Sequence, residues 1–474
     1  MKPRMLSELV ELMQPAAVEV LGDDVLVGPD VVTDNRKVTP GALFVAIPGE
    51  RVDGHSFATA ARDAGAAAVV GTHRTEADMP HLLGEDSVQT LSWIARGVVR
   101  EARARGLVSI GVTGSSGKTS TKDLIAQVLE RSGPTVAPEG SQNNEIGVPL
   151  TACRVGQDTR YLVSEMGARG VGHIAWLTSL VPLDVAVVLN VGQAHVGEFG
   201  GIEMTARAKS ELVRDLSDEG WAVLNADDPN VAAMAEKTRG RIAWVGRGEL
   251  PDGALRLRAR DVDVDALSRP RFTLEVTDAS GTRTAPVELG VIGRHQVGNA
   301  LSAAAVGLIV GMGLDDVAAA LSAAEVRSSW RMALSRLPGG ALLLNDAYNA
   351  NPDSLAAALA TAADIVEANR QEHPAARAIA VIGDMLELGE GASDAHLQAG
   401  RLAADLRYDE VVAVGEHAEA VVQGAAENVR VARVAARDEV AGSLRLSPGD
   451  VILVKGSRGI GLERVAAELE EETK

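Results

Sequence analysis

Apolar positions recur along the chain in two patterns, which predict helices alternating with buried strands. Met5, Leu9, Leu12 and Met13 share one face of a predicted N-terminal helix, and residues 86–105 repeat the same helical spacing. Short apolar runs lie between such helices and are typical of strands buried in a parallel sheet. These runs are residues 42–47, 66–70, 108–112, 161–163, 185–189, 222–224, 341–344, 378–382, 410–414 and 451–454. The alternation predicts an α/β fold.

The length of the chain, 474 residues, exceeds what one hydrophobic core supports and predicts about three domains. Residues 1–85 are expected to form a small α/β domain, residues 86–325 a central P-loop domain with a parallel sheet, and residues 326–474 a Rossmann-like C-terminal domain. Residues 254–292 alternate polar and apolar side chains around the turn DASG, which predicts an antiparallel insertion in the central domain.

Polar residues follow several of the C-terminal strands, and three of these strands end in a glycine turn. Open α/β sheets bind ligands at the carboxyl ends of their strands. We therefore expect Asp346, Asp384 and Lys455 to face a crevice.

Composition excludes several functional classes. The net charge of −19 argues against nucleic acid as a partner, and a single cysteine excludes a disulfide framework and a Cys-rich metal site. No run of about twenty apolar residues is present, which argues against membrane insertion. The N-terminal segment has helical spacing instead of the pattern of a signal peptide. A cytoplasmic, monomeric protein is expected.

The sequence IGVTGSSGKTSTK at residues 110–122 places a glycine-rich turn between the strand at 108–112 and a helix predicted over 120–131. In such a loop backbone N–H groups surround phosphate oxygens, Lys118 reaches the β- and γ-phosphates, and the Thr119 hydroxyl holds magnesium. The common P-loop spacing would place its first glycine at Val112, whereas this chain has Gly114. Because strand, lysine, hydroxyl and helix are all in register, the segment predicts a nucleotide site instead of a surface turn.

Three further residues are candidates for the same site. Glu165 ends one predicted strand and His195 follows the next, so both are plausible magnesium ligands beside the phosphate loop. An ordinary strand-end carboxylate and a hydrogen-bonded core histidine are equally open, and magnesium prefers oxygen to nitrogen. Lys209 lies on a predicted helix, where a lysine is by default solvated.

Several motifs together resemble the Mur ligases of peptidoglycan synthesis. They span all three predicted domains and comprise TGSSGKTSTKD, QNNEIGVPL (142–150), VSEMGA (163–168), LNVGQAHVGEFG (189–200), AKSE (208–211), GRHQVGNALSAAAVG (293–307) and NDAYNANPDS (345–354). The segments at 33–57, 382–389 and 454–463 are most similar to the branch that adds D-alanyl-D-alanine. The DNPR motif of the diaminopimelate-adding branch is absent.

The resemblance implies roles for individual residues. It assigns Gly114, Ser115, Ser116, Gly117, Lys118, Thr119, Ser120, His295, Asn299, Arg331, Asp346, Tyr348 and Asn349 to ATP. It implies that Thr119, Glu165 and His195 bind magnesium, and that Lys209 reacts with carbon dioxide to give a carbamate that helps to hold a second metal. Lys118, Lys209, His195 and Glu165 would form the catalytic group.

For the other substrates, the resemblance implies that Asp34, Arg36, Asp53, Gly54 and His55 hold the UDP-sugar end, and that Asn143 and Asn144 contact substrate. Two positions depart from the usual family pattern. Asn35 replaces the serine before the arginine, and Asn349 replaces a histidine.

The implied activity is an ATP- and Mg²⁺-dependent amide ligase that joins D-alanyl-D-alanine to UDP-N-acetylmuramoyl-tripeptide through an acyl phosphate. Another Mur-type or a folylpolyglutamate-type ligase is the nearest alternative, although the latter does not need residues 33–57. A P-loop regulatory NTPase is the other alternative. It would carry an NKxD segment, and the similar stretch Asn225–Asp228 lacks the lysine.

Overall fold

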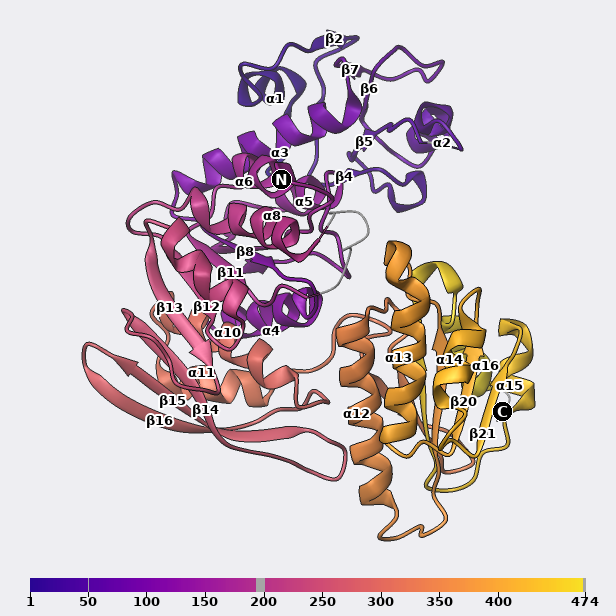
Figure 1. Cartoon of the computed structure of the whole chain (residues 1–474). Helices are drawn as coiled ribbons and strands as arrows, with labels where there is room; N and C mark the ends of the chain where they lie inside the picture. Colours follow the sequence, from indigo (N-terminus) through magenta and orange to yellow (C-terminus); the bar gives the residue numbers. More distant parts are fainter. Residues whose placement is uncertain (50, 193–200, 472–474) are drawn as a thin grey trace.

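The computed structural model describes residues 1–49, 51–192 and 201–471, and their arrangement is drawn in Figure 1. Within these residues the largest sheet, called the central sheet, has the strand order β16-β15-β14-β13-β12-β11-β8-β10-β9. Its strands are β8 Val108–Thr113, β9 Thr135–Val136, β10 Tyr161–Glu165, β11 Val185–Val188, β12 Trp221–Asn225, β13 Arg241–Gly246, β14 Leu255–Val264, β15 Pro270–Asp278 and β16 Gly281–Glu288. Strands β8 to β13 pair in parallel, as the apolar runs predict.

The predicted antiparallel insertion is confirmed, and it extends the central sheet. β14 pairs in parallel with β13, after which β15 and β16 add antiparallel strands around the turn at Ala279 and Ser280. Phe272, Leu274 and Val276 are buried on one face of β15, as their spacing of two predicts.

Helices cover both faces of the central sheet. One face packs against α4 (Lys118–Glu130), α10 (Gln296–Ile309) and α11 (Leu314–Ser322), and the other against α3 (Ser87–Arg103), α5 (Gly147–Cys153), α6 (His173–Leu180) and α8 (Ile202–Arg214). Successive residues of a strand point to opposite faces. Val187 therefore packs on the face covered by α4, α10 and α11, and Val188 packs on the face covered by α3, α5, α6 and α8. The sheet is therefore buried on both sides, which explains its continuous apolar runs.

The N-terminal sheet has the order β2-β7-β6-β5-β4 among the residues described. Its elements are β2 Glu19–Leu21, β4 Val31–Val32, β5 Leu43–Val45, β6 Ala68–Gly71 and β7 His81–Leu83, with η1 Asn35–Lys37, η2 Gly54–Phe57 and α2 Ala58–Asp63. A short pairing of β1 (Arg4–Met5) with β3 (Leu26–Val27) flanks α1 (Leu6–Leu12). Strands β4 to β7 are parallel and β2 is antiparallel.

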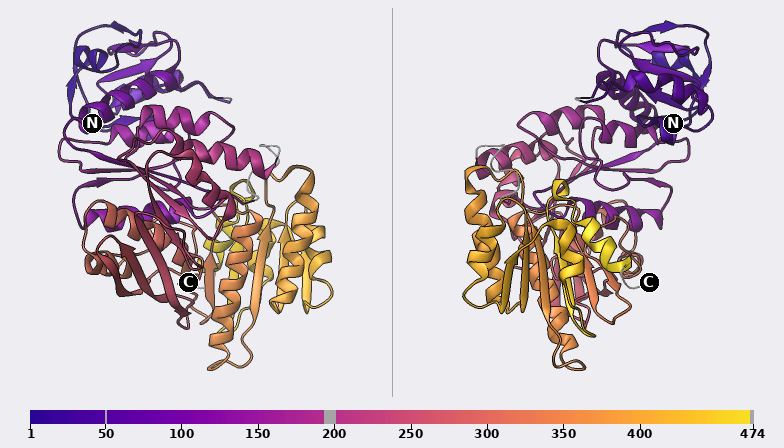
Figure 2. Two further views of the ribbon diagram at one scale, coloured as in Figure 1. Left: turned by 60° about the vertical axis from the view of Figure 1, so that its left-hand side comes forward. Right: turned by 90° about the vertical axis from the view of Figure 1, so that its right-hand side faces the viewer.

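Helix α3 joins the N-terminal and central parts. The Asp86 carboxylate accepts a 2.7 Å hydrogen bond from Gln89 N and caps the helix, close to the predicted start. Leu91, Ala95 and Val99 are fully buried in an apolar cluster that contains residues of α1 on one side and of α5 and α6 on the other. Figure 2 shows the N-terminal part lying against the central part on this side.

The C-terminal sheet has the order β17-β18-β22-β19-β20-β21 in the described residues. The strands are β17 Ala333–Arg336, β18 Leu342–Asn345, β19 Ala378–Gly383, β20 Glu410–Val414, β21 Val431–Val434 and β22 Val451–Lys455. One face packs against α12 (Pro352–Asn369), α13 (Ala392–Asp405) and α14 (Ala418–Ala425), the other against α15 (Val440–Ser443) and α16 (Glu463–Glu471). All pairs except β17 with β18 are parallel, as in a Rossmann-like sheet.

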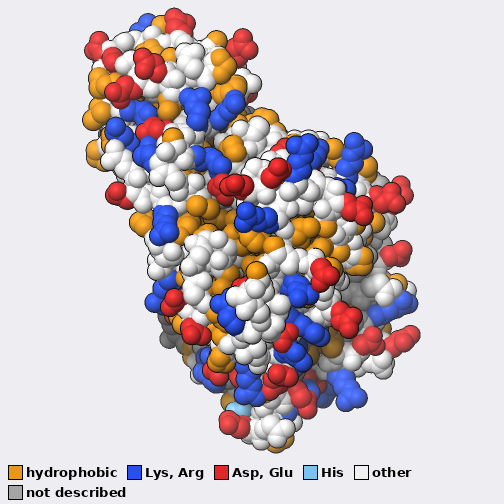
Figure 3. Space-filling view, turned by 90° about the vertical axis from the view of Figure 1, so that its left-hand side faces the viewer, with side chains coloured by type: hydrophobic (Ala, Val, Ile, Leu, Met, Phe, Trp, Pro, Cys, Tyr) orange, Lys and Arg blue, Asp and Glu red, His pale blue; other side chains and the backbone are white. Residues whose placement is uncertain are grey.

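Charges of both signs are interspersed over the face in Figure 3, which shows no large patch of one sign there. The net charge of −19 disfavours anions over the surface as a whole, so an anionic ligand must be held by locally placed cationic and N–H groups. Among the described helices, none has the length and apolar character needed to cross a membrane.

Candidate active site

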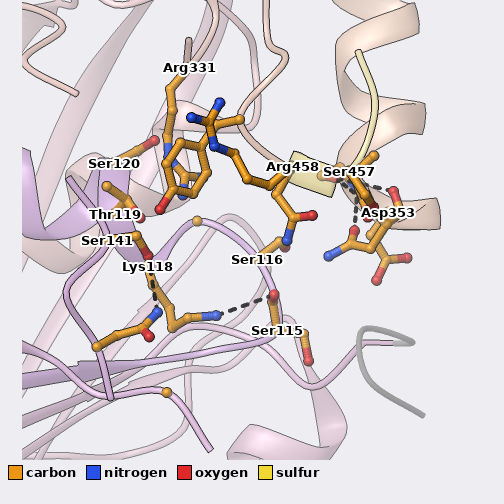
Figure 4. Close-up of a pocket in the computed structure, with 18 of the residues that line it drawn as sticks. Ser115, Ser116, Lys118, Thr119, Ser120, Ser141, Arg331, Asp353, Ser457 and Arg458 are labelled. Carbon is orange, nitrogen blue, oxygen red and sulfur yellow. Dashed lines mark hydrogen bonds between the residues drawn. The ribbon is translucent and has the colours of Figure 1, made fainter. Parts of the chain in front are cut away.

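A cleft of about 570 Å³ lies between the central and C-terminal sheets and collects most of the predicted site residues. The central wall carries Ser115, Ser116, Gly117, Lys118, Thr119, Ser120, Asn143, Asn144, Glu165, Lys209, His295 and Asn299, and the facing wall carries Arg331, Asp346, Tyr348 and Asn349. Figure 4 shows Arg331 and Arg458 on the side of the cleft opposite Lys118 and Ser115. The predicted nucleotide site and the predicted crevice are thus two walls of one cleft.

The phosphate loop connects β8 to α4 and opens onto this cleft. The helix begins at Lys118, two residues before the predicted start, because Gly117 ends the loop in the left-handed region with φ of +78°. A Cβ atom at Gly117 would lie 2.8 Å from Asn299 Oδ1, so a larger residue would have to displace that side chain and would be strained at this positive φ. Among the described residues, the N–H groups of Gly117, Lys118, Thr119 and Ser120 have no hydrogen-bond acceptor. They form an anion-binding set at a helix N-terminus.

Lys118 is half-buried and folds back onto its own loop. Its Nζ donates a 2.7 Å hydrogen bond to the carbonyl of Gly114, the loop residue that does not itself line the cleft. Removal from water lowers the pKa of Lys118, Glu165 opposes this shift, and the guanidinium of Arg331 adds to it. An anion bound beside the ammonium would raise this pKa again and favour the charged form of Lys118.

Glu165 is fully buried at the end of β10, and its carboxylate accepts three side-chain hydrogen bonds from described residues. Thr119 Oγ1 donates to its Oε2 at 2.9 Å, while Ser141 Oγ and Asn143 Nδ2 donate to Oε1 at 2.7 and 2.8 Å. The hydroxyl and carboxylate oxygens of Thr119 and Glu165 lie side by side beside the loop. Hard oxygen ligands of this kind suit magnesium, so these residues fit the predicted ion.

Lys209 lies on α8 with only 4% of its surface exposed, which rules out the solvated helix position that its spacing allows. Burial and the neighbouring Lys118 lower the pKa of Lys209 well below its usual value. Its ammonium has no hydrogen bond or ion pair with any residue that the structure describes. His195, the remaining candidate of this group, lies outside the described residues.

The C-terminal wall is built on a buried ion pair. Lys455 Nζ donates to the Asp346 carboxylate and, at 2.8 Å, to the carbonyl of Asn349. The Arg331 guanidinium lies over the Tyr348 ring, 4.2 Å from its centroid. Asp346 and Lys455 both line the cleft, so the prediction that they face a crevice is confirmed.

The same prediction is wrong for Asp384. Its buried carboxylate accepts hydrogen bonds from Glu416 N at 2.7 Å and His417 N at 3.0 Å, and the residue does not line the cleft. The turn after β20, with Gly415 at φ of +122°, brings these N–H groups over the end of β19. The Asp384 carboxylate therefore pairs with N–H groups of a neighbouring loop and does not face a ligand.

The residues predicted for the UDP-sugar lie apart from this cleft, at the carboxyl edge of the N-terminal sheet. Asp34 follows β4 and accepts hydrogen bonds from Arg36, and Asp53 follows β5 and accepts one from His55 N at 3.0 Å. A Cβ atom at Gly54 would lie 2.6 Å from the backbone of Ile47. The parallel pairing of β4 with β5 brings the two segments to one edge of the sheet.

Asn144 lines the cleft but turns its side-chain oxygen inward, where it accepts a 2.8 Å hydrogen bond from Gly147 N at the start of α5. The sequence interpretation assigned no role to three further residues, Ser141, Asn190 and Arg458, all of which line the cleft. Asn190 and Arg458 lie just beyond the ends of β11 and β22, so the rule that ligands bind at strand carboxyl ends could have found them. No comparable signal marks Ser141.

Three family descriptions match most of the chain. The description "Mur ligase family, catalytic domain" matches residues 30–104, "Mur ligase middle domain" matches residues 112–307, and "Mur ligase, glutamate ligase domain" matches residues 330–458.

Individual relatives match over their full lengths. The UDP-N-acetylmuramoyl-tripeptide–D-alanyl-D-alanine ligases of Mycobacterium tuberculosis (strain ATCC 25618 / H37Rv) and Escherichia coli (strain K12) are 42% and 34% identical, covering 97% and 98% of this chain and 96% and 98% of their own. A crystal structure of MurF from Acinetobacter baumannii superposes with a TM-score of 0.83 at 28% identity and 99% coverage of both chains. MurF ligase from Thermotoga maritima in complex with ADP gives 0.75 at 28% identity, covering 94% of this chain and 97% of its own.

Proposed function

The chain belongs to the Mur ligase family, and we propose that it joins D-alanyl-D-alanine to UDP-N-acetylmuramoyl-tripeptide with the use of ATP, the MurF reaction of peptidoglycan synthesis. The observation that carries this conclusion is the likeness to ligases of that name over 97% of the chain. The likeness includes the N-terminal part, which a folylpolyglutamate-type ligase does not need. The cleft supports it, because a phosphate loop faces a second wall of polar and cationic residues.

The proposed chemistry has two steps. The terminal carboxylate of the tripeptide attacks the γ-phosphorus of ATP, which gives an acyl phosphate and ADP. The amine of D-alanyl-D-alanine then attacks the acyl carbon, an amide bond forms, phosphate leaves, and the amine gives up a proton. Domain closure over the cleft would exclude the water that hydrolyses an acyl phosphate.

The proposed ATP site uses both walls. The free N–H groups of residues 117–120 and the ammonium of Lys118 would face the phosphates, where preorganised donors stabilise the charge that develops during phosphoryl transfer. His295 and Asn299 would lie toward the adenine. Arg331, Asp346, Tyr348 and Asn349 would complete the site from the C-terminal side.

Magnesium is a proposed cofactor. Thr119 and Glu165 would hold it, with His195 as a further ligand, and a carbamate on Lys209 would help to hold a second ion. Bound magnesium would neutralise charge on the phosphates. The depressed pKa of Lys209 supports the carbamate, since only a neutral amine reacts with carbon dioxide.

The remaining assignments concern the other substrates and the setting. Asp34, Arg36, Asp53, Gly54 and His55 would hold the UDP-sugar end, and Asn143 and Asn144 the peptide near the carboxylate that reacts. Residues 1–85, 86–325 and 326–474 would be the UDP-sugar, ATP and C-terminal domains. We propose a monomer that works in the cytoplasm, where ATP and nucleotide-linked sugars are available.

Phosphate release from ATP tests the function. Release is expected only when UDP-N-acetylmuramoyl-tripeptide and D-alanyl-D-alanine are both present, because a sheltered acyl phosphate turns over only when the amine arrives. Equal release without either substrate would favour a regulatory NTPase. Activity with a glutamate acceptor in place of the dipeptide would favour another ligase of the same architecture.

A further inference from the structure

Asn190, just beyond β11, is bound to the phosphate loop through both ends of its carboxamide. Its Oδ1 accepts hydrogen bonds from Ser115 N and Ser116 N, each at 2.9 Å, and its Nδ2 donates to the Ser116 carbonyl at 3.2 Å. The backbone carbonyl of Asn190 also accepts from Ser115 N at 3.1 Å. One side chain thus forms hydrogen bonds with the N–H groups of Ser115 and Ser116, which make up the first half of the loop.

This contact divides the loop into two groups of N–H donors. The first two, from Ser115 and Ser116, point at Asn190, and the next four, from residues 117–120, have no acceptor among the described residues. An N–H group without a partner seeks another acceptor or moves toward water. By holding the first group, Asn190 keeps the turn in the shape that leaves the second group free.

The segment that carries Asn190 is itself fixed from the next strand. Asn225 Nδ2 donates to the Leu189 carbonyl at 2.9 Å, and the Asp228 carboxylate accepts from Val191 N at 2.7 Å. Asn225 and Asp228 belong to the stretch that resembles a guanine-reading motif without its lysine. The structure shows what these residues do instead, which is to brace the backbone on both sides of Asn190.

We infer that Asn190 is a positioning residue that orders the phosphate loop so that the N–H groups of residues 117–120 receive ATP. The inference rests on the proposed function, because it concerns how that enzyme binds its nucleotide. An asparagine suits the position for two reasons. It offers an acceptor and a donor to Ser116 at once, and it is neutral, whereas an aspartate would lose the donor and repel the phosphates.

Binding of Mg²⁺-ADP and amide hydrogen exchange test the inference on the full-length enzyme. Asn190→Ala is expected to weaken ADP binding about tenfold or more and to speed exchange at Ser116 most, because Ser115 N keeps the backbone carbonyl of residue 190 as an acceptor. The KM for D-alanyl-D-alanine is expected to stay within about twofold of wild type, because the change is confined to the phosphate loop. Asn190→Asp is expected to keep the two amides protected, because it retains an acceptor oxygen, and still to weaken ADP binding through its charge.

Asn369→Ala is the matched control, because Asn369 Nδ2 also donates to a backbone carbonyl, that of Gly449 at 2.9 Å, but outside the cleft. ADP binding by Asn190→Ala within twofold of wild type, unchanged exchange at Ser115 and Ser116, or an equal loss in Asn369→Ala would overturn the inference. If Asn190→Ala does not fold, fast amide exchange at Ser116 in Asn190→Asp, which keeps the acceptor oxygen, would overturn it. A wild-type enzyme without ligase activity would instead count against the proposed function.

Discussion

The Thr119 hydroxyl donates a 2.9 Å hydrogen bond to Glu165 Oε2, and this bond joins the first turn of α4 to the end of β10. The two residues are 46 positions apart in the chain. They meet because α4 follows β8, and β10 pairs with β8 in parallel. Their oxygens therefore lie together at the carboxyl edge of the sheet, beside the loop proposed to bind triphosphate.

Glu165→Gln is expected to raise the magnesium concentration needed for half-maximal activity by about tenfold or more, because the amide keeps the side-chain volume but loses the charge that attracts the cation. Steady-state rates across a magnesium titration measure this. Glu139→Gln is the matched control, since Glu139 is 82% exposed and pairs with Arg154 away from the cleft. Equal magnesium dependence of the two variants would contradict a metal-binding role.

Lys118→Ala is expected to reduce kcat/KM on the order of a hundredfold or more while leaving the fold intact. Among the residues that the structure describes, the Lys118 ammonium bonds only to the loop carbonyls of Gly114 and Ser115, so the fold loses little without it. Circular dichroism and phosphate release measure the two effects. Lys237→Ala serves as control because Lys237 bonds to Ser210 outside the cleft. Near-normal turnover of folded Lys118→Ala would mean that the loop is not catalytic.

Lys209→Ala is expected to lose activity, and added short-chain carboxylic acids are expected to restore part of it by replacing the carbamate. The pKa of Lys209 lies well below its usual value, so the neutral amine that reacts with carbon dioxide is present at lower pH than for an exposed lysine. Phosphate release with and without the acids measures the rescue. Full activity of the variant would reject any role for this side chain, and an unmodified amine in a high-resolution map of the metal-bound enzyme would reject the carbamate.

Asp346→Ala is expected to destabilise the protein by about 3–5 kcal/mol, because it leaves the buried ammonium of Lys455 without its anion. Burial lowers the pKa of Lys455, and Asp346 opposes that shift. Denaturant unfolding measures the loss, and adding Lys455→Met to Asp346→Ala is expected to recover much of it. Asp438→Asn breaks an exposed pair with Arg437 and is expected to cost less than about 1 kcal/mol. Equal losses in both pairs would contradict the buried-pair argument.

The wild-type enzyme is expected to lose more stability in acid than His396→Gln. His396 is buried, and its Nε2 accepts a 2.8 Å hydrogen bond from Met385 N, which a protonated ring cannot do. Burial and the facing His417 lower the pKa of His396, while Asp384 opposes the shift. The unfolded histidine therefore binds a proton first as pH falls below 6.5.

In that range, from 6.5 down to the pKa of the folded state, the free energy of unfolding is expected to fall by up to about 1.4 kcal/mol per pH unit through this group. Denaturant unfolding at a series of pH values measures it. His373→Gln, at an exposed position, is the control. Parallel pH profiles of the wild type and His396→Gln would contradict the prediction.

The local pattern of the sequence was sufficient to predict many of the longer strands and the helices α1, α3 and α4. The runs at 108–112 and 161–163 became parts of β8 and β10, and the helical spacing of Leu91, Ala95 and Val99 became the buried face of α3. Burial repeats with the period of the element itself, so these features depend on near neighbours in the chain. The phosphate loop was also readable, since its glycines, Lys118 and Thr119 are contiguous.

Composition and spacing did not predict where side chains lie when their location depends on the order of strands in a sheet. Resemblance suggested a role for Lys209, but spacing alone allowed a solvated lysine and only the packing of α8 showed it to be buried. Asp384 and Asp346 both follow strands of the C-terminal sheet. The Asp384 carboxylate accepts a hydrogen bond from the turn after β20, whereas Asp346 lines the cleft.

Asn190 shows the same limit most clearly. The sequence by itself determined the longer buried strands, the helix α3 and the phosphate loop, because those features rest on local burial and backbone geometry. Only the tertiary structure decided which loops meet, because the order of strands in a sheet follows from the crossovers and the packing of both faces. That order places β11 beside β8, and it thereby brings the Asn190 carboxamide to the N–H groups of Ser115 and Ser116.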